Sequence, residues 1–145
     1  VSYRTILKSV LSSSGITRTG SRIEAQMKSV LEHIKCDSEV EGNNVFYWKK
    51  DSNKKKYNIY RVNSNRNMDD ISIYEIINAI RFIVQSQVSL PKDALEKEVF
   101  TLLGSKKTEE GLRQIRRAIR YGLDNNIIAV KDSKIVSGDK INVFE

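Results

Sequence analysis

Residues 104–136 read GSKKTEEGLRQIRRAIRYGLDNNIIAVKDSKIV. Gly104 is suited to end one helix, because glycine adopts the left-handed conformation of a C-terminal cap without strain, and Thr108 is suited to begin the next helix as its N-cap. Beyond Thr108 the apolar residues recur every three or four positions, at Leu112, Ile115, Ile119 and Leu123. This spacing places them on one face and predicts an amphipathic helix of about four turns.

Two short β-prone runs follow that helix, at 127–130 and 134–136, with the polar pair Asp132-Ser133 between them. Runs of this length around a polar turn predict a β-hairpin. A helix, a second helix and then a hairpin is the order of elements in a winged helix.

The same pattern occurs earlier in the chain. A shift of 89 residues (104 − 15) brings Gly15 onto Gly104 and Thr19 onto Thr108. The first copy spans 15–48 and predicts a second helix of the same kind. Its apolar stripe has five members: Ile23, Met27, Val30, Leu31 and Ile34.

The first copy also has its own start signal and hairpin. Thr19 or Ser21 is expected to cap the helix, and Ser21 with Glu24 has the form of a capping box. A hairpin is expected at 39–48. One more helix precedes this copy, at 3–12, where four apolar residues share a face (Ile6, Leu7, Val10 and Leu11).

The second copy is preceded by two helices. Asp69 or Asp70 is expected to cap the first, whose buried face is Ile73, Ile76, Ile77, Ile80, Ile83 and Val84. Residues 85–90 break it, and Pro91 is expected at the first position of the next helix, which Gly104 ends.

These elements predict an α+β chain, mostly helical, with two winged-helix-like units that each combine a helix-turn-helix with a β-hairpin. The first unit, 1–64, lacks its leading helix and includes a linker strand at 57–62. The second unit, 65–145, is complete, and its last residues, 141–144, are either an added strand or a tail.

The composition is basic. The 145 residues include 25 Lys and Arg against 18 Asp and Glu, which gives a net charge of +7 and an isoelectric point near 9.5. This excess favours a polyanionic partner, although it also serves solubility alone. The one cysteine, Cys36, excludes an internal disulfide and favours a reducing, cytoplasmic location. No apolar run is long enough to cross a bilayer, so we expect no membrane association.

The strongest functional signal is a basic face on the expected helix after Thr108. At 100° per residue, four arginines fall within a sector of about 100° that lies away from the apolar stripe: Arg113, Arg116, Arg117 and Arg120. Gln114 and Tyr121 flank this face, and no acid on the same turns is expected to neutralise it. Arginines on the exposed face of such a helix contact phosphates or read guanine in the major groove. The alternative is a solvated helix face without a ligand.

Further cations surround this helix. Lys106 and Lys107 precede it, and Lys131 and Lys134 lie on the expected hairpin, where winged helices often contact the DNA backbone. We include all four, together with Gln114, in the predicted nucleic-acid site.

The first copy carries a weaker signal, because acidic and basic residues are mixed on its matching face. Arg18 and Arg22 lie at the start of its helix, where they are placed to hold a phosphate with the exposed amides. A role in packing or partner binding is an equal alternative for this copy.

No catalytic, metal or cofactor site is predicted. His33 and Cys36 are the only residues of their types, whereas metal sites usually need three or four ligands. The G-x4-G spacing of Gly15 and Gly20 lacks the lysine of a phosphate-binding loop, so no nucleotide cofactor is expected. We therefore expect this chain not to be an enzyme.

The run GITRTGSRI at 15–23, with Phe46-Tyr47-Trp48 after the helix, resembles an uncharacterised bacterial domain. That domain lies near the C-terminal end of large superfamily 1 helicase-like proteins, often beside a nuclease-like domain. Residues 71–103 resemble the segment that follows it. The resemblance implies an accessory module of an ATP-driven nucleic-acid enzyme and assigns no role to individual residues.

The second copy has Glu109-Glu110-Gly111 where the first has Gly20-Ser21-Arg22, so its loop is expected to differ. The chain begins at Val1 without a methionine, and we expect it to be part of a longer protein.

These patterns predict that the chain binds nucleic acid, with double-stranded DNA favoured, as an accessory module of a larger helicase-like protein. The alternative is a protein-interaction or dimerisation module whose partner is the helicase core of the same polypeptide or a second copy. Sequence specificity and the choice between DNA and RNA do not follow from these residues.

Overall fold

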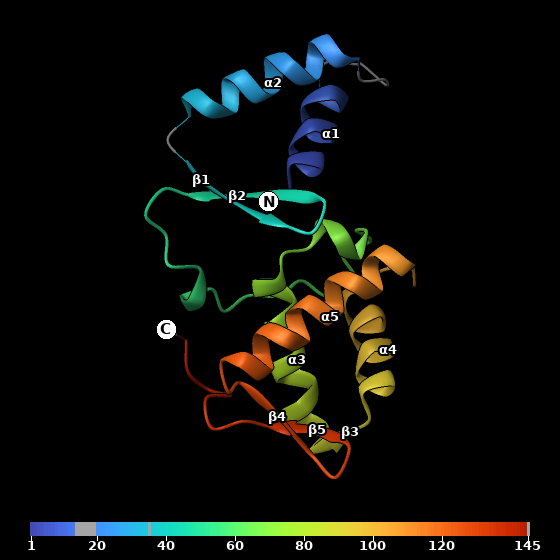
Figure 1. Ribbon diagram of the computed structural model, residues 1–145. Coiled ribbons are helices and arrows are strands. Elements are labelled where there is room, and N and C mark those ends of the chain that lie inside the picture. The colour runs from blue at the N-terminus through green and yellow to red at the C-terminus, as the bar shows by residue number, and fades with distance from the viewer. Residues whose placement is uncertain (14–19, 35, 145) are drawn as a thin grey trace. The chain divides into compact units, whose positions relative to one another are not determined.

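The computed structural model describes residues 1–13, 20–34 and 36–144 (Figure 1). The chain divides into two compact units, Val1–Ser52 and Asn53–Glu145. The described residues contain five α-helices and two small antiparallel sheets. The prediction of a mostly helical α+β fold is therefore confirmed. In the part of the chain that is described, no helix has both the length and the apolar character needed to span a membrane.

The first unit contains two helices and a hairpin. Its elements are α1 (Tyr3–Ser13), α2 (Ser21–His33), β1 (Cys36–Glu41) and β2 (Asn44–Lys49). The strands are antiparallel, with Glu41 opposite Asn44 at the turn. Gly42 in this turn has a φ of 64°, in the left-handed region that glycine adopts without strain. Both predicted helices and the predicted hairpin are present.

The start of α2 differs from the prediction. Its N-cap is Gly20, which has no side chain to accept a hydrogen bond, and Ser21 is already the first helical residue. The capping box of Ser21 and Glu24 therefore does not form. Thr19, the other predicted cap, lies outside the described residues.

The core of the first unit is small. Among its described residues, the buried apolar side chains are Leu7, Leu11, Leu31 and Phe46. The predicted stripe of α2 is only partly buried, because Val30 is 54% exposed and Ile34 is 52% exposed. The stripe predicted for the first copy therefore lies only partly in the core.

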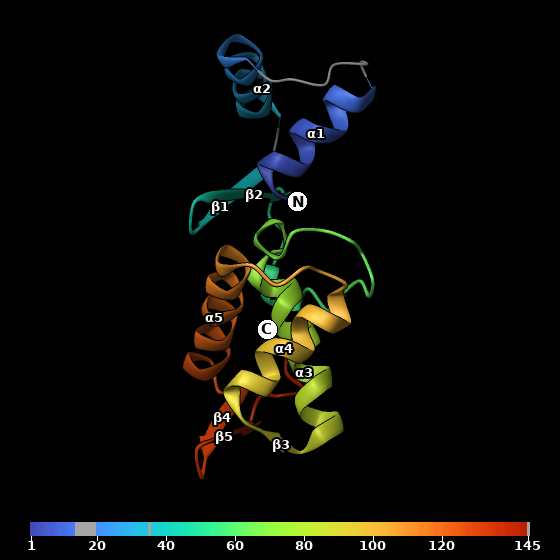
Figure 2. The ribbon, with the colours of Figure 1, turned by 90° about the vertical axis from the view of Figure 1, so that its right-hand side faces the viewer.

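The second unit contains three helices and a three-stranded sheet. Its elements are η1 (Lys54–Lys56), η2 (Met68–Asp70), α3 (Ile73–Gln87), β3 (Ser89–Leu90), α4 (Lys92–Leu103), α5 (Glu109–Asp124), β4 (Ile128–Lys131) and β5 (Lys134–Ser137). The strand order is β3-β5-β4. Figures 1 and 2 both show this sheet at one end of the three helices.

The connection between α4 and α5 is built as expected. Gly104 ends α4 in the left-handed conformation, with φ 68° and ψ 37°. The Thr108 hydroxyl accepts a hydrogen bond from the Gly111 N–H at 3.0 Å and caps α5. The Asp132-Ser133 turn joins β4 to β5 as predicted, and both residues have positive φ.

The starts of α3 and α4 are each displaced from the prediction. Ser72 caps α3, because its Oγ accepts from the Tyr74 N–H at 3.3 Å. Asp69 and Asp70 instead form part of η2. Pro91 is the N-cap of α4 rather than its first helical residue.

The core of the second unit lies between the three helices and the sheet. All its helices and strands except η1 contribute to it, with Ile76, Ile80, Leu95, Leu103, Ile115 and Ile128 among the fully buried side chains. On α5, Ile115 and Ile119 are buried, while Leu112 and Leu123 pack against the core and remain partly exposed. The apolar stripe therefore fixes which side of α5 faces inward.

Residues 57–62 do not form the predicted linker strand. Asn78 of α3 donates from Nδ2 to the carbonyls of Tyr57 at 2.8 Å and Ile59 at 3.1 Å. The Arg61 N–H donates to Glu75 at 3.2 Å. Side chains of α3 thus occupy backbone groups that a neighbouring strand would otherwise need.

The same segment moves the boundary between the units. The N–H groups of Asn63 and Ser64 donate to the carbonyls of Leu102 at 3.1 Å and Leu103 at 3.0 Å. Residues 53–64 therefore group with the second unit, whereas the sequence placed them in the first.

The break predicted at 85–90 contains a strand that the sequence did not indicate. β3 pairs with β5, with Ser89 opposite Val136 and Leu90 opposite Ile135. Residues 141–144 show no strand.

Candidate nucleic-acid interface

The basic face of α5 is positioned by the burial of its opposite side. Because Ile115 and Ile119 point into the core, the arginines on the other side of the helix turn outward. Arg113, Arg116 and Arg120 are exposed, and Arg117 is half-buried. The structure brings all four predicted arginines to one surface.

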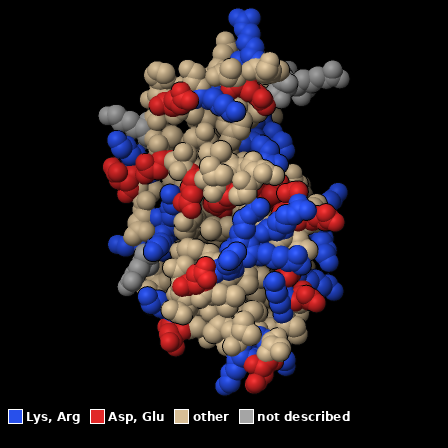
Figure 3. Space-filling view, viewed as in Figure 1, with Lys and Arg blue, Asp and Glu red and all other residues tan. Residues whose placement is uncertain are grey.

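The four arginines line a surface hollow at the side of α5. Its other lining residues are Lys92, Ile119, Leu123 and Asp124. Lys92 is exposed at the start of α4, so the basic surface extends from α5 to a second helix. Figure 3 shows basic side chains gathered over α5, with acidic side chains towards its two ends.

Two of these arginines have acidic partners that the sequence analysis missed. Arg113 pairs with Glu110 and also approaches Glu109, at 3.8 Å. Arg116 pairs with Glu96 of α4 at 3.4 Å. The prediction that no acid neutralises this face is wrong, because one partner precedes the arginine on the same turn and the other comes from a different helix.

Glu96, the partner of Arg116, is nearly buried. Its side chain is only 7% exposed, so the Arg116 guanidinium covers a nearly buried carboxylate. A buried charge without a partner is strongly unfavourable, and Arg116 is therefore held towards α4.

The other two arginines have no acidic partner in the described part of the chain. Arg117 donates from Nη1 to the side-chain oxygen of Gln114 at 2.8 Å. Arg120 is exposed and makes no such contact. These two guanidiniums are the ones whose charge remains available to a ligand.

Gln114 does not belong to the exposed face. It is fully buried, and its Nε2 donates to the Ile71 carbonyl at 2.9 Å. The prediction that it contacts nucleic acid is wrong, because its side chain is used to orient Arg117 and to hold η2. Tyr121 also turns away and packs edge-on against Tyr74, with ring centroids 5.3 Å apart.

The four predicted lysines lie outside the hollow. Lys106 and Lys107 are exposed immediately before α5. Lys131 and Lys134 are exposed and lie opposite each other across the β4–β5 turn.

The predicted cations of the first unit are a separate case. Arg22 is exposed on α2. Arg18 lies outside the described residues. Arg22 does not line the basic hollow, whose lining residues all belong to the second unit.

Lys92 is the site residue that sequence reasoning missed. It follows Pro91 at the start of a helix, and nothing in the pattern of α4 relates it to the arginines of α5. Their proximity depends on how the two helices pack.

Comparison with family models, with curated proteins and with solved structures finds no match. Arguments about function therefore rest on the geometry and charge of this surface. In the described residues, no group of three or more His, Cys, Asp or Glu side chains is placed to hold a metal ion.

Proposed function

We propose that residues 53–145 bind double-stranded nucleic acid, with DNA favoured, through the arginine face of α5. The observation that carries the proposal is the hollow where four arginines and Lys92 meet. Two of the arginines, Arg117 and Arg120, have no acidic partner there. A concentration of cations on one helix face is the expected electrostatic footprint of a nucleic-acid-binding module.

The order of elements supports this reading. In our proposal, α4 and α5 are the two helices of a helix-turn-helix, and β4 and β5 form the hairpin of a winged-helix-like unit. α5 is then the recognition helix, the helix that such units present to the major groove. The first unit, with two helices and a hairpin, is proposed as a related unit that lacks a leading helix.

The chemistry of the hollow suggests how a duplex would be held. Arg117 and Arg120 would contact phosphate oxygens, and contacts to phosphates dominate affinity in such complexes. Leu123, which lines the same hollow and is partly exposed, offers an apolar surface for sugar or thymine methyl groups. Lys131 and Lys134 would add backbone contacts from the hairpin.

The resemblance of 15–23 and 71–103 to a helicase-associated bacterial domain supports a context for this binding. In that context the chain is an accessory module that holds the nucleic acid for a larger helicase-like protein, and it does no catalysis itself.

The test is a titration of labelled duplex DNA at two salt concentrations. The double variant Arg117→Gln/Arg120→Gln should weaken binding and reduce the slope of log K against log salt by up to about 1.8, since each lost phosphate contact removes about 0.9. The matched control is Lys49→Gln/Lys50→Gln, which removes two exposed charges from the first unit.

Equal affinity and equal salt slope for the arginine and lysine double variants would show that α5 is not the binding surface. Undetectable binding of the unmodified chain would reject the proposal altogether. Circular dichroism of each variant verifies that it is folded.

A second candidate function concerns the first unit. Val30 and Ile34 are more than half exposed on α2, at 54% and 52%. Exposed aliphatic groups on one helix favour protein association. We propose, as the alternative, that this unit associates with a second copy of the chain.

Sedimentation over a range of concentrations tests this alternative. A dimer that Val30→Glu converts to a monomer supports it. A chain that is monomeric at all concentrations rejects it.

A further inference from the structure

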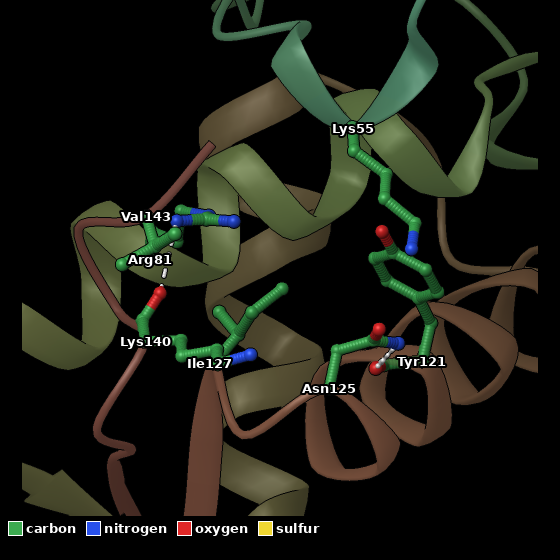
Figure 4. Close-up of a pocket in the computed structure, with 7 residues that line it drawn as sticks. All are labelled: Lys55, Arg81, Tyr121, Asn125, Ile127, Lys140 and Val143. Atoms are coloured by element: carbon green, nitrogen blue, oxygen red, sulfur yellow. Dashed lines mark hydrogen bonds between the residues drawn. The ribbon is translucent and has the colours of Figure 1, made fainter. Parts of the chain in front are cut away.

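A second cationic pocket lies elsewhere in the second unit, away from the arginine face of α5. Its lining residues are Lys55, Arg81, Tyr121, Asn125, Ile127, Lys140 and Val143 (Figure 4). They come from η1, α3, α5, the connection from α5 to β4 and the segment after β5. None of the four arginines of the α5 hollow lines this pocket.

Arg81 is the central residue of the pocket. It is only 6% exposed, although it carries a positive charge. Burial lowers the pKa of its guanidinium, while the nearby Tyr121 acts to raise it. No carboxylate among the described residues pairs with Arg81. A buried cation without an anionic partner is unfavourable, so this arrangement calls for an explanation.

Only some of the N–H groups of this guanidinium have hydrogen-bond partners in the protein. Nη1 donates to the Ile141 carbonyl at 2.6 Å and, more weakly, to the Lys140 carbonyl at 3.4 Å. The Phe144 ring covers the guanidinium at 4.2 Å. Nε is buried without a hydrogen-bond partner. A role limited to holding the chain after β5 accounts for Nη1 and for the face that Phe144 covers, but it leaves Nε without a partner.

Two lysines face the same space. Figure 4 shows Arg81 on one side and Lys55 reaching down beside Tyr121 on the other. Lys140 also lines the pocket, and no Asp or Glu is among its described lining residues. Three cations therefore surround one small opening, and none of the described residues that line it supplies a balancing anion.

The size of the pocket limits what it accepts. Its cavity volume is about 60 Å³. This is well below the range of about 300–1,000 Å³ that is usual for ligand pockets. A single compact anionic group fits better than an extended ligand.

We propose that this pocket binds one phosphate group, held by Arg81, Lys55 and Lys140. A guanidinium with two ammonium groups is a common means of holding phosphate, because the guanidinium donates to two oxygens while the ammonium groups add charge. The phosphate is either free, as inorganic phosphate or a phosphomonoester, or a terminal phosphate of a nucleic-acid strand. This site is independent of the duplex surface proposed for α5.

The first measurement uses inorganic phosphate. Thermal unfolding of the whole chain is followed as phosphate is added, with sodium chloride at matched ionic strength as the reference. The midpoint should rise with phosphate concentration and saturate, because a ligand that binds only the folded state stabilises it. Isothermal titration calorimetry then gives the dissociation constant.

Variants of the two lysines test whether phosphate binds in this pocket. Lys55→Gln and Lys140→Gln should each weaken phosphate binding about tenfold, the effect expected for one charged hydrogen bond. Lys56→Gln is the matched control, because Lys56 is an exposed lysine of the same short helix, η1, and does not line the pocket. Arg81→Gln should abolish binding. If Arg81→Gln unfolds the chain, phosphate binding by the two lysine variants remains the test of the site.

Oligonucleotides with and without a 5′-phosphate distinguish the two sources. If free phosphate binds and Lys55→Gln and Lys140→Gln weaken it, the pocket takes a free group. If only the 5′-phosphorylated strand shows this dependence, the pocket takes a strand end. The proposal is overturned if phosphate stabilises the chain no more than chloride and the 5′-phosphate has no effect. It is equally overturned if Lys56→Gln weakens binding as much as the pocket variants.

Discussion

The arginines of α5 share a helix face but differ in what they contact. Arg113 and Arg116 are paired with glutamates, whereas Arg117 and Arg120 have no acidic partner in the described residues. Charge that is already paired contributes less to a polyanionic ligand, because the ligand must compete with the acid. Individual contacts, rather than the count of arginines, therefore decide the strength of this surface.

Removing a competing acid should strengthen nucleic-acid binding. Glu110→Gln removes the closer of the two acids that contact Arg113 and leaves Glu109 at 3.8 Å. Duplex affinity should rise by about two- to fivefold, since exposed ion pairs are worth up to about 1 kcal/mol. Fluorescence anisotropy at low salt measures this. Glu98→Gln is the control, an exposed acid of α4 outside this cluster. A rise of the same size in the control variant would contradict the prediction.

Glu75 is a buried carboxylate that holds two arginines of the second unit. Its side chain is 4% exposed and accepts from both Arg61, at 2.9 Å, and Arg66. Burial acts to raise the pKa of Glu75, but the hydrogen bonds from Arg66 and Arg61 outweigh it and hold the pKa below its ordinary value. Glu75→Gln should lower the free energy of unfolding by about 2–3 kcal/mol, because it leaves two cations unpaired.

The same carboxylate predicts a dependence on acid. Since its pKa is lower in the folded state, its contribution is fully present above the unfolded pKa of about 4.3 and is lost as the pH falls through the folded pKa. Urea unfolding between pH 7 and pH 3 should show the gap between wild type and Glu75→Gln narrowing below about pH 4.3. A gap that stays constant over this range would show that the ion pairs are not its source.

Among the elements, α5 depends on its N-terminal cap. Thr108 is the side chain that satisfies an otherwise free N–H in the first turn, that of Gly111. Gly111 is also closely packed, since a Cβ there would lie 2.9 Å from Phe100 and Met68 side-chain atoms. The start of the helix that carries the arginines is therefore fixed both by a hydrogen bond and by packing.

Loss of this cap should destabilise the second unit. Thr108→Ala removes one hydrogen bond to a helix N-terminus and should lower the free energy of unfolding by about 1 kcal/mol. Thr101→Ala is the matched control, because the Thr101 hydroxyl bonds only within an exposed part of α4. Denaturant unfolding compares the two, and an equal loss in both would show that the cap is unimportant.

In the whole molecule, stability is distributed unequally between the units. The described core cluster lies entirely within Met68–Ile135, whereas the first unit buries few apolar side chains. Small units bury too little surface to be stable by a wide margin. The second unit therefore has what it needs to fold without the first.

Expression of residues 53–145 alone tests this. The fragment should unfold cooperatively, with a midpoint within about 4 °C of the same transition in the full chain, which corresponds to less than about 1 kcal/mol. Residues 1–52 alone should unfold without a clear transition. Calorimetry of the full chain and of the two fragments measures these transitions. If the fragment 53–145 is unfolded, the assignment of its core is contradicted.

Short-range patterns in the sequence were enough to predict the helices of the second unit, the connection at Gly104 and Thr108, the hairpin and the common face of four arginines. Each of these depends on residues within a few positions of one another, where helix and turn geometry leaves little choice. The arginine face in particular follows from the burial of Ile115 and Ile119.

Packing between distant segments decided the rest. Glu96 meets Arg116 from 20 residues away, and Gln114 is buried against Ile71 from 43 residues away. The pairing of β3 with β5, and the use of Asn78 in place of a linker strand, have the same origin. Periodicity reports which side of an element is apolar, but the partners of its polar groups are set by which elements meet. The sequence therefore indicated where the charge of α5 lies, and only the tertiary structure decided which of its arginines remain available.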